Sequence, residues 1–128
     1  MTDTFSVELD HADAPRAEYL SIVALLHTPN VHQGKLIRVV GFASLGFEGN
    51  GLFLSAVDLD NGISKNALWL EIQPHVYDAL DRSYVLVEGT FDGHNKGHLQ
   101  MWSGSVVNVA LIESWAALVD QPRARSGA

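Results

Sequence analysis

The segment Tyr84–Phe91 (YVLVEGTF) constrains the fold of this chain more than any other. Val87 and Phe91 fall on one side of an alternating pattern, and Glu88 and Thr90 fall on the other. A period of two is the pattern of a β-strand with one face toward a core. The segment therefore predicts a strand of a half-buried sheet.

Four further segments have strand composition. They are Lys35–Ala43, Leu52–Ser55, Ala67–Ile72 and a long strand that runs from His98–Ser103 through a break at Gly104 into Ser105–Ile112. Glu48-Gly49-Asn50-Gly51 predicts a hairpin turn between the first two of them. Glycines inside strands, such as Gly41 and Gly89, are typical of the bends that close a barrel.

Short helices are expected at two further places. Ser21–His27 has an N-cap serine and ends at Thr28-Pro29, because a residue before proline avoids the helical region. Pro74–Leu80 is expected to form a helix between strands three and four. Three strands, a helix and two strands is the order of a five-stranded OB-like barrel, here with an extra N-terminal helix. A generic five-strand sheet or roll is the alternative.

The chain divides into three parts. Residues 1–18 form an acidic arm, residues 19–120 form the barrel domain, and residues 121–128 have the composition of a tail. In the arm, Phe5, Val7 and Leu9 alternate, which fits either an added strand or disorder. The polar stretch Asp58–Asn66 is expected to be a loop.

Composition excludes several kinds of site. The chain has no cysteine, so it has no disulfide, no thiolate nucleophile and no cysteine-based zinc site. Its first residues carry acids where a secretion signal carries bases, and no apolar run is long enough to cross a membrane. We therefore expect a cytoplasmic protein with no membrane segment.

The charge balance bears on the partner. The formal net charge is −7. Nucleic-acid affinity comes mainly from lysine and arginine that neutralise phosphates, so an acidic barrel is poorly suited to it. A basic protein partner fits this charge better. The charge does not distinguish a monomer from a homodimer, so the oligomeric state stays open.

Four phrases of the sequence also resemble those of a family of short bacterial proteins without an established activity. The phrases are GKLIRVVGFASLGFEGNGLFLS, NGISKNALWLEI, YVLVEGTFD and NKGHLQMWSGSVVNV, which together cover most of residues 20–113. The family pattern is GFxxxxFEGN, KNALWL, YVxVEGTF and GHxxxxSG. The resemblance implies an OB-like barrel and carries no activity. This chain has Gly51 where the family tends to have alanine.

Motifs of catalysis are absent from the sequence. It has no G-x-S-x-G, no phosphate-binding loop and no G-x-G-x-x-G, so we expect neither an enzyme nor a cofactor. His94 and His98 with Asp92 could hold a metal, but HNKGH contains glycine and reads as a turn, which favours a solvated loop. Asp58–Gly62 fails the calcium-loop pattern.

Two tryptophans, Trp69 and Trp102, stand among polar residues and could form an exposed aromatic platform. The alternative is that both tryptophan rings pack against the edge of the barrel and have a structural role only. The candidate binding residues are Asn50, Lys65, Asn66, Trp69, His94, Asn95, Lys96, His98 and Trp102.

Three functions remain open from the sequence. The first is a non-catalytic module that binds a protein, for example an immunity-type protein that neutralises a basic partner. The second is a single-stranded nucleic-acid-binding OB domain. The third is a small metal-dependent enzyme that uses Asp92, His94 and His98.

Overall fold

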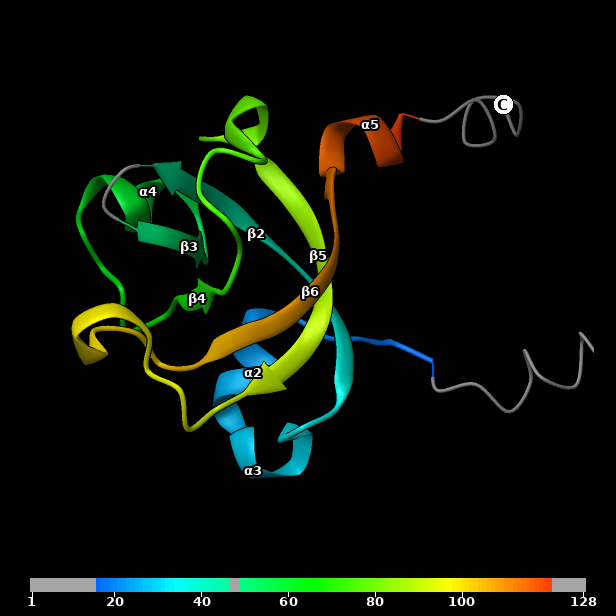
Figure 1. Cartoon of the computed structure of the whole chain (residues 1–128), viewed down its shortest axis with the longest axis vertical. Helices are drawn as coiled ribbons and strands as arrows, with labels where there is room; N and C mark the ends of the chain where they lie inside the picture. Colours follow the sequence, from blue (N-terminus) through cyan, green and yellow to red (C-terminus); the bar gives the residue numbers. More distant parts are fainter. Residues whose placement is uncertain (1–15, 47–48, 121–128) are drawn as a thin grey trace, which may run out of the picture.

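The protein is mainly β, with a closed five-strand barrel, one extra strand and a few short helices (Figure 1). The computed structural model describes residues 16–46 and 49–120. Most of the predicted arm with its Phe5–Leu9 alternation, the tail 121–128, and Glu48 of the predicted hairpin turn lie outside the described residues.

Five strands form the barrel: β2 (Leu36–Gly46), β3 (Gly49–Phe53), β4 (Leu68–Leu70), β5 (Tyr84–Asp92) and β6 (Ser105–Ser114). Their order around the barrel is β2-β3-β4-β6-β5, and β5 pairs again with β2. Every neighbouring pair in the barrel is antiparallel except β4 with β6. The short strand β1 (Glu18–Tyr19) pairs in parallel with β2 from outside the ring.

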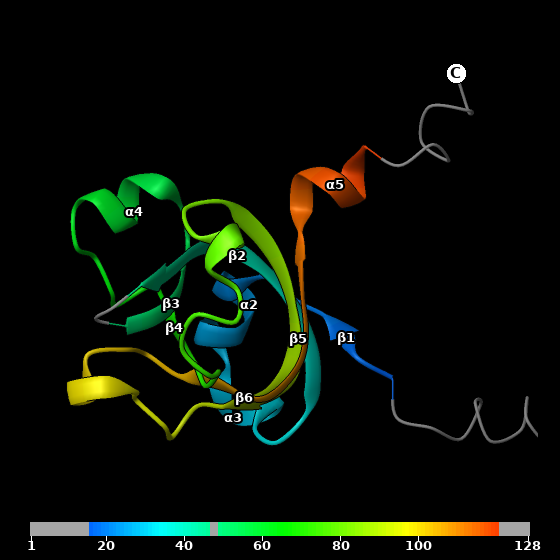
Figure 2. The same ribbon diagram turned by 45° about the horizontal axis from the view of Figure 1, so that its top comes forward.

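Two strands make the closure possible. The long strand β2 pairs through residues 36–42 with β5 and through residues 42–46 with β3. The short strand β4 places Trp69 opposite Ser105 and Leu70 opposite Val106 of β6. The curvature of β5 and β6 around the interior is visible in Figure 2.

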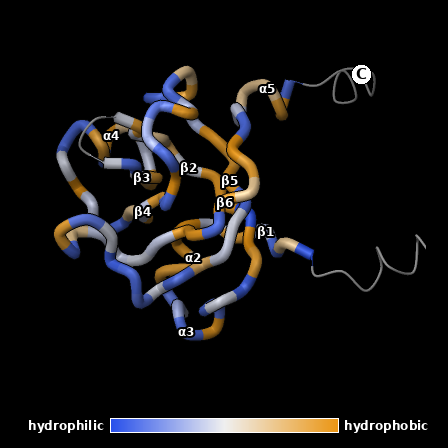
Figure 3. The backbone as a smooth tube through the Cα atoms, in the orientation of Figure 1, coloured by the Kyte–Doolittle hydropathy of each residue, from blue (hydrophilic) through white to orange (hydrophobic). Residues whose placement is uncertain are grey.

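The core fills the barrel with residues that alternate along its strands, and Figure 3 shows hydrophobic colour along β5 and at α2. The largest fully buried apolar side chains are Ile22, Leu25, Ile37, Val39, Leu52, Leu68, Leu70, Val85, Val87, Phe91 and Val106. The predicted buried face of Tyr84–Phe91 is therefore confirmed. On the outer face of the same strands, Arg38 Nε donates to Glu88 Oε1 across the β2–β5 pair at 2.7 Å.

The helices are short: α2 (Ile22–His27), α3 (Pro29–His32), α4 (Ala56–Asp60), α5 (Trp115–Val119) and two 3-10 turns, η1 (Asp78–Leu80) and η2 (His98–Gln100). The α2 helix confirms the predicted N-cap, because Ser21 Oγ accepts a hydrogen bond from Ala24 N. Where the sequence predicted a helix over Pro74–Leu80, the chain forms turns that end in η1.

Several predicted elements are wrong in type or place. The predicted strand His98–Ser103 is the 3-10 turn η2 followed by bends, because the backbone of Leu99 and of Gln100 is left-handed with φ of 59° at each. A strand cannot contain such a pair, so β6 begins only at Ser105.

The other corrections concern turns and loops. The predicted hairpin of the first two strands is confirmed, because β2 and β3 pair antiparallel with Gly46 opposite Gly49. The predicted turn is misplaced, since Gly49–Gly51 belongs to strand β3. Pro29 does end α2, but it also starts α3 at a position where proline is favoured. The predicted loop Asp58–Asn66 begins inside α4, whose N-cap Ser55 accepts from Asp58 N. No helix in the described part of the chain is long and apolar enough to cross a membrane.

Replacing Leu70 with alanine tests the barrel core. Leu70 is fully buried in β4, so its truncation should lower the free energy of unfolding by about 2–5 kcal/mol. Urea denaturation measures this loss. Val23→Ala on the exposed side of α2 is the matched control, and it should change the free energy by less than about 0.5 kcal/mol. Equal effects of the two substitutions would contradict this core.

Candidate binding groove

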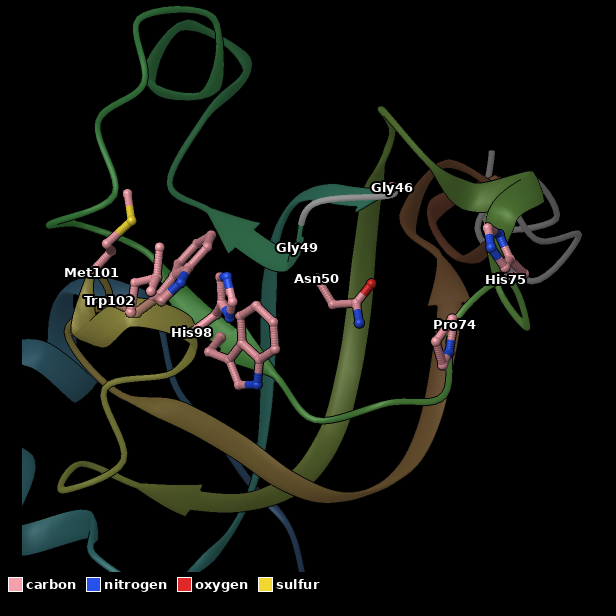
Figure 4. Close-up of a pocket in the computed structure, with 10 residues that line it drawn as sticks. Gly46, Gly49, Asn50, Pro74, His75, His98, Met101 and Trp102 are labelled. Atoms are coloured by element: carbon pink, nitrogen blue, oxygen red, sulfur yellow. The ribbon is translucent and has the colours of Figure 1, made fainter.

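An open groove lies on one side of the barrel, between strands β3 and β4 and the connection from β5 to β6. Its volume is about 750 Å³. In Figure 4, His98 and Trp102 form one side, Pro74 and His75 form the other, and Asn50 lies between them. The described lining residues are Gly46, Gly49, Asn50, Trp69, Pro74, His75, His98, Leu99, Met101 and Trp102.

Strand β4 aims Trp69 into the groove. Because successive side chains of a strand point to opposite faces, burial of Leu68 and Leu70 inside the barrel turns Trp69 outward. The Trp69 ring stacks on His98, with 6.2 Å between centroids and 27° between planes. It also meets Trp102 at 5.7 Å and 57°. The three rings form one continuous aromatic surface, which we call the aromatic cluster.

Trp102 is seated against two glycines. A Cβ atom on Gly51 would lie 2.4 Å from Trp102 Cη2, and one on Gly97 would lie 2.6 Å from Trp102 Cδ1. The ring also packs edge-on against Phe53, at 5.4 Å between centroids. Trp102 is therefore half-buried rather than free in solvent, and its position depends on the missing side chain at Gly51.

Trp102 lies in the β5–β6 connection, and hydrogen bonds within this connection fix its shape. Lys96 Nζ donates to the carbonyls of Gly93 at 2.8 Å and Ser103 at 3.2 Å. Asn95 Oδ1 accepts from Gly97 N at 2.9 Å, and the Asn95 carbonyl accepts from Ser105 Oγ at 2.7 Å. Asn95 and Lys96 therefore shape the loop instead of lining the groove.

The base of this connection is tied to the turn before β2. Gln33 Nε2 donates to Asp92 Oδ1 at 3.0 Å, and Gly93 N donates to Gln33 Oε1 at 2.7 Å. The hydrogen bond from Gln33 is the main reason that the pKa of Asp92 lies below its ordinary value. The backbone N–H of His94 adds to this lowering, and burial opposes it.

The structure brings together only some of the predicted candidates. Asn50, Trp69, His98 and Trp102 line the groove. The others lie outside its lining: Lys65, Asn66, His94, Asn95 and Lys96. Of these, Lys65 contributes its carbonyl, which accepts a hydrogen bond from Ser103 Oγ.

Sequence reasoning missed several groove residues, chief among them Pro74, His75, Leu99 and Met101. Two apolar residues inside the polar loop were a usable signal for Leu99 and Met101. No local pattern marks Pro74 and His75, because they reach the groove only through the path of the chain after β4.

The rim of the groove exposes apolar side chains. Leu99 is 72% exposed and Met101 is 49% exposed. In Figure 3 the β5–β6 connection is mostly hydrophilic, with a short hydrophobic stretch at its outer tip. Leu99 is also held in the left-handed region, which costs a non-glycine residue of order 1 kcal/mol. Backbone strain of this kind clusters at functional sites, which makes the rim a candidate for one.

None of the described lining residues is Asp, Glu, Lys or Arg, and two of them, His75 and His98, are histidines. The nearest carboxylate bonded to the lining is Asp78, whose Oδ2 lies 2.8 Å from His75 Nδ1. The indole N–H groups of Trp69 and Trp102 donate no hydrogen bond within the described part of the chain. Asn50 Nδ2 reaches the Ile72 carbonyl only at 3.5 Å.

The predicted metal alternative finds little support in the geometry. Across residues 16–46 and 49–120, no three His, Cys, Asp or Glu side chains are close enough to hold a metal ion. Asp92 is engaged with Gln33, while His98 stacks on Trp69. Asp92, His94 and His98 therefore do not form a joint ligand set.

Comparison of the chain with protein-family models, with curated proteins and with solved structures found no match. The groove is therefore interpreted from its own geometry.

Replacing Gly51 with alanine tests the seat of Trp102. The new Cβ would overlap the indole ring, so Trp102 should move out and the free energy of unfolding should fall by about 1–3 kcal/mol. Tryptophan fluorescence and urea denaturation measure both effects. Gly46→Ala is the matched control, because a Cβ there meets nothing within 4 Å. Unchanged fluorescence in the Gly51→Ala variant would contradict the packing of the Trp102 ring against Gly51.

A second prediction concerns pH. Folding lowers the pKa of Asp92, so the ionised carboxylate stabilises the folded state above its unfolded pKa. That stabilisation is lost as the pH falls through the folded-state pKa. Gln33→Leu removes the main donor and should raise the pKa of Asp92 toward its ordinary value. A carbon-13 NMR titration of the Asp92 carboxyl group measures the change. Identical titration curves for the wild-type and Gln33→Leu proteins would contradict the role of Gln33 as the main donor.

Proposed function

We propose that this protein is a non-catalytic module that binds another protein through the groove. The observation that carries the proposal is that half-buried Trp69 and Trp102 line the same groove as the exposed Leu99 and Met101. Protein interfaces are enriched in tryptophan and methionine and depleted of charge at their centres. The described lining has this composition.

Charge supports a basic partner. The chain has a net charge of −7, while the described groove lining contains no Asp, Glu, Lys or Arg. The acidic charge of the whole chain would speed the encounter with a basic protein, and the groove would then make the close contacts. An immunity-type protein that neutralises a basic toxin is a concrete form of this function.

We propose further that the barrel is of the OB type. Three strands, η1 and two strands follow one another along the chain, and β4 and β6, the third and fifth barrel strands, lie side by side. The groove lies over β3, β4 and the β5–β6 connection, where OB barrels commonly bind ligands. The family resemblance supports the same barrel type.

Single-stranded nucleic acid is the less favoured ligand of such a barrel. Binding it needs lysine or arginine along the backbone path as well as aromatic rings for stacking. The aromatic cluster could supply the stacking, but the described lining supplies no cation.

A peptide-display selection tests the binding function. A library of random peptides is selected on the immobilised protein, and the enriched pool is then measured on two variants. Leu99→Ser combined with Met101→Ser should weaken binding of the pool about tenfold, because both side chains are exposed at the rim. Circular dichroism should show the same fold, since neither side chain is in the core.

Val23→Ser is the matched control, with a valine 62% exposed on α2 away from the groove lining. It should leave binding of the pool unchanged. Failure to enrich any peptide, or equal binding to the wild-type protein and the rim variant, would overturn the proposed function.

A further inference from the structure

We propose that the groove receives a proline-rich segment in the polyproline II conformation, with lysine or arginine beside the prolines. This inference rests on the proposed function, since it names the kind of protein segment that the groove would bind. Three properties of the groove support it: walls lined by rings, indole N–H groups without an acceptor in the described part of the chain, and a described lining without Asp, Glu, Lys or Arg in an acidic protein.

The first property is the shape of the walls. The rings of Trp69 and Trp102 meet at 57°, so they form a ridged surface rather than a flat one. Pro74 on the opposite side is also rigid and apolar. Polyproline II segments dock in grooves lined by aromatic side chains. Because the rings of Trp69 and Trp102 contact each other, with 5.7 Å between centroids, the proline rings would pack on the outer surface of this pair. A flat nucleobase would find less area on rings that tilt in this way.

The second property is the supply of donors. Polyproline II has no internal hydrogen bonds, and proline has no backbone N–H, so such a segment offers only carbonyl acceptors. An indole N–H is a donor only. The backbone N–H groups of Trp69 and Trp102 are bonded, but their indole N–H groups donate no hydrogen bond within residues 16–46 and 49–120. The amide of Asn50 is only weakly engaged. Donors in the groove therefore match acceptors in the segment.

The third property is the charge. A described lining without Asp, Glu, Lys or Arg suits an uncharged core of prolines, and the chain's net charge of −7 favours basic residues at its ends. Asp78, bonded to His75, places one carboxylate beside the groove wall. The half-exposed Met101 and the exposed Leu99 offer apolar contact that a sugar chain or a phosphate backbone would not use.

The test uses NMR signals of the three tryptophans in the full chain. Nitrogen-15-labelled protein is titrated with a peptide of eight prolines followed by two lysines. The indole N–H signals of Trp69 and Trp102 should shift in a saturable way. Trp115 lies in α5, across the barrel from the η2 connection in both ribbon views (Figures 1 and 2), so its signal should stay in place.

A matched peptide separates conformation from charge. Replacing the eight prolines by alternating glycine and serine keeps the two lysines but removes polyproline II structure, and this peptide should leave the indole signals unshifted. Trp69→Phe keeps an aromatic ring and loses the N–H, so it should weaken binding of the proline peptide about fivefold. Val23→Ser should bind it like the wild-type protein.

Three results would overturn the inference. They are no saturable shift with the proline peptide, an equal shift with the glycine-serine peptide, and a saturable shift of the same two indoles with a thymidine oligonucleotide or a glucose hexasaccharide. If the display selection still yields peptides that depend on Leu99 and Met101, the protein-binding function stands and only the proline-rich identity fails.

Discussion

The pairing of β4 with β6 is the contact on which the rest of this structure depends. It consists of two parallel register pairs, Trp69 with Ser105 and Leu70 with Val106. Trp69 N donates to the Gly104 carbonyl at 2.9 Å, and Glu71 N donates to the Val106 carbonyl at 3.0 Å. Without these hydrogen bonds the five strands would form an open sheet, with β4 at one edge and β6 at the other. With them, the barrel closes and the β5–β6 connection comes to lie over β4.

Closure also explains why the groove is aromatic. Leu68 and Leu70 fill the interior, which leaves Trp69 on the outer surface beside the returning chain. Trp102 then fits over Gly51, where a methyl group would collide with its ring. The same short strand, β4, thus supplies Leu68 and Leu70 to the core and Trp69 to the groove. Within residues 16–46 and 49–120, the indole N–H groups of Trp69 and Trp102 have no acceptor, so these groups and the exposed rim are the features that the described fold does not use.

Local patterns predicted the parts of this structure that local forces decide. The buried face of Tyr84–Phe91 and the capped helix after Ser21 could be derived from periodicity and a side-chain cap. His98–Ser103 also alternates, yet it is no strand, because Leu99 and Gln100 adopt left-handed backbone. The aromatic residues of the site could be guessed from their chemistry. Pro74 and His75 could not, because their place beside Asn50 depends on the folded path of the chain.

The central claim is that parallel pairing of β4 with β6 assembles the aromatic cluster. A nuclear Overhauser spectrum of the free protein in solution measures this most directly. The account predicts contacts between the backbone protons of Trp69 and those of Ser105, together with contacts between ring protons of Trp69 and Trp102, whose centroids lie 5.7 Å apart. Absence of the backbone contacts, or an antiparallel pattern between the two strands, would contradict it.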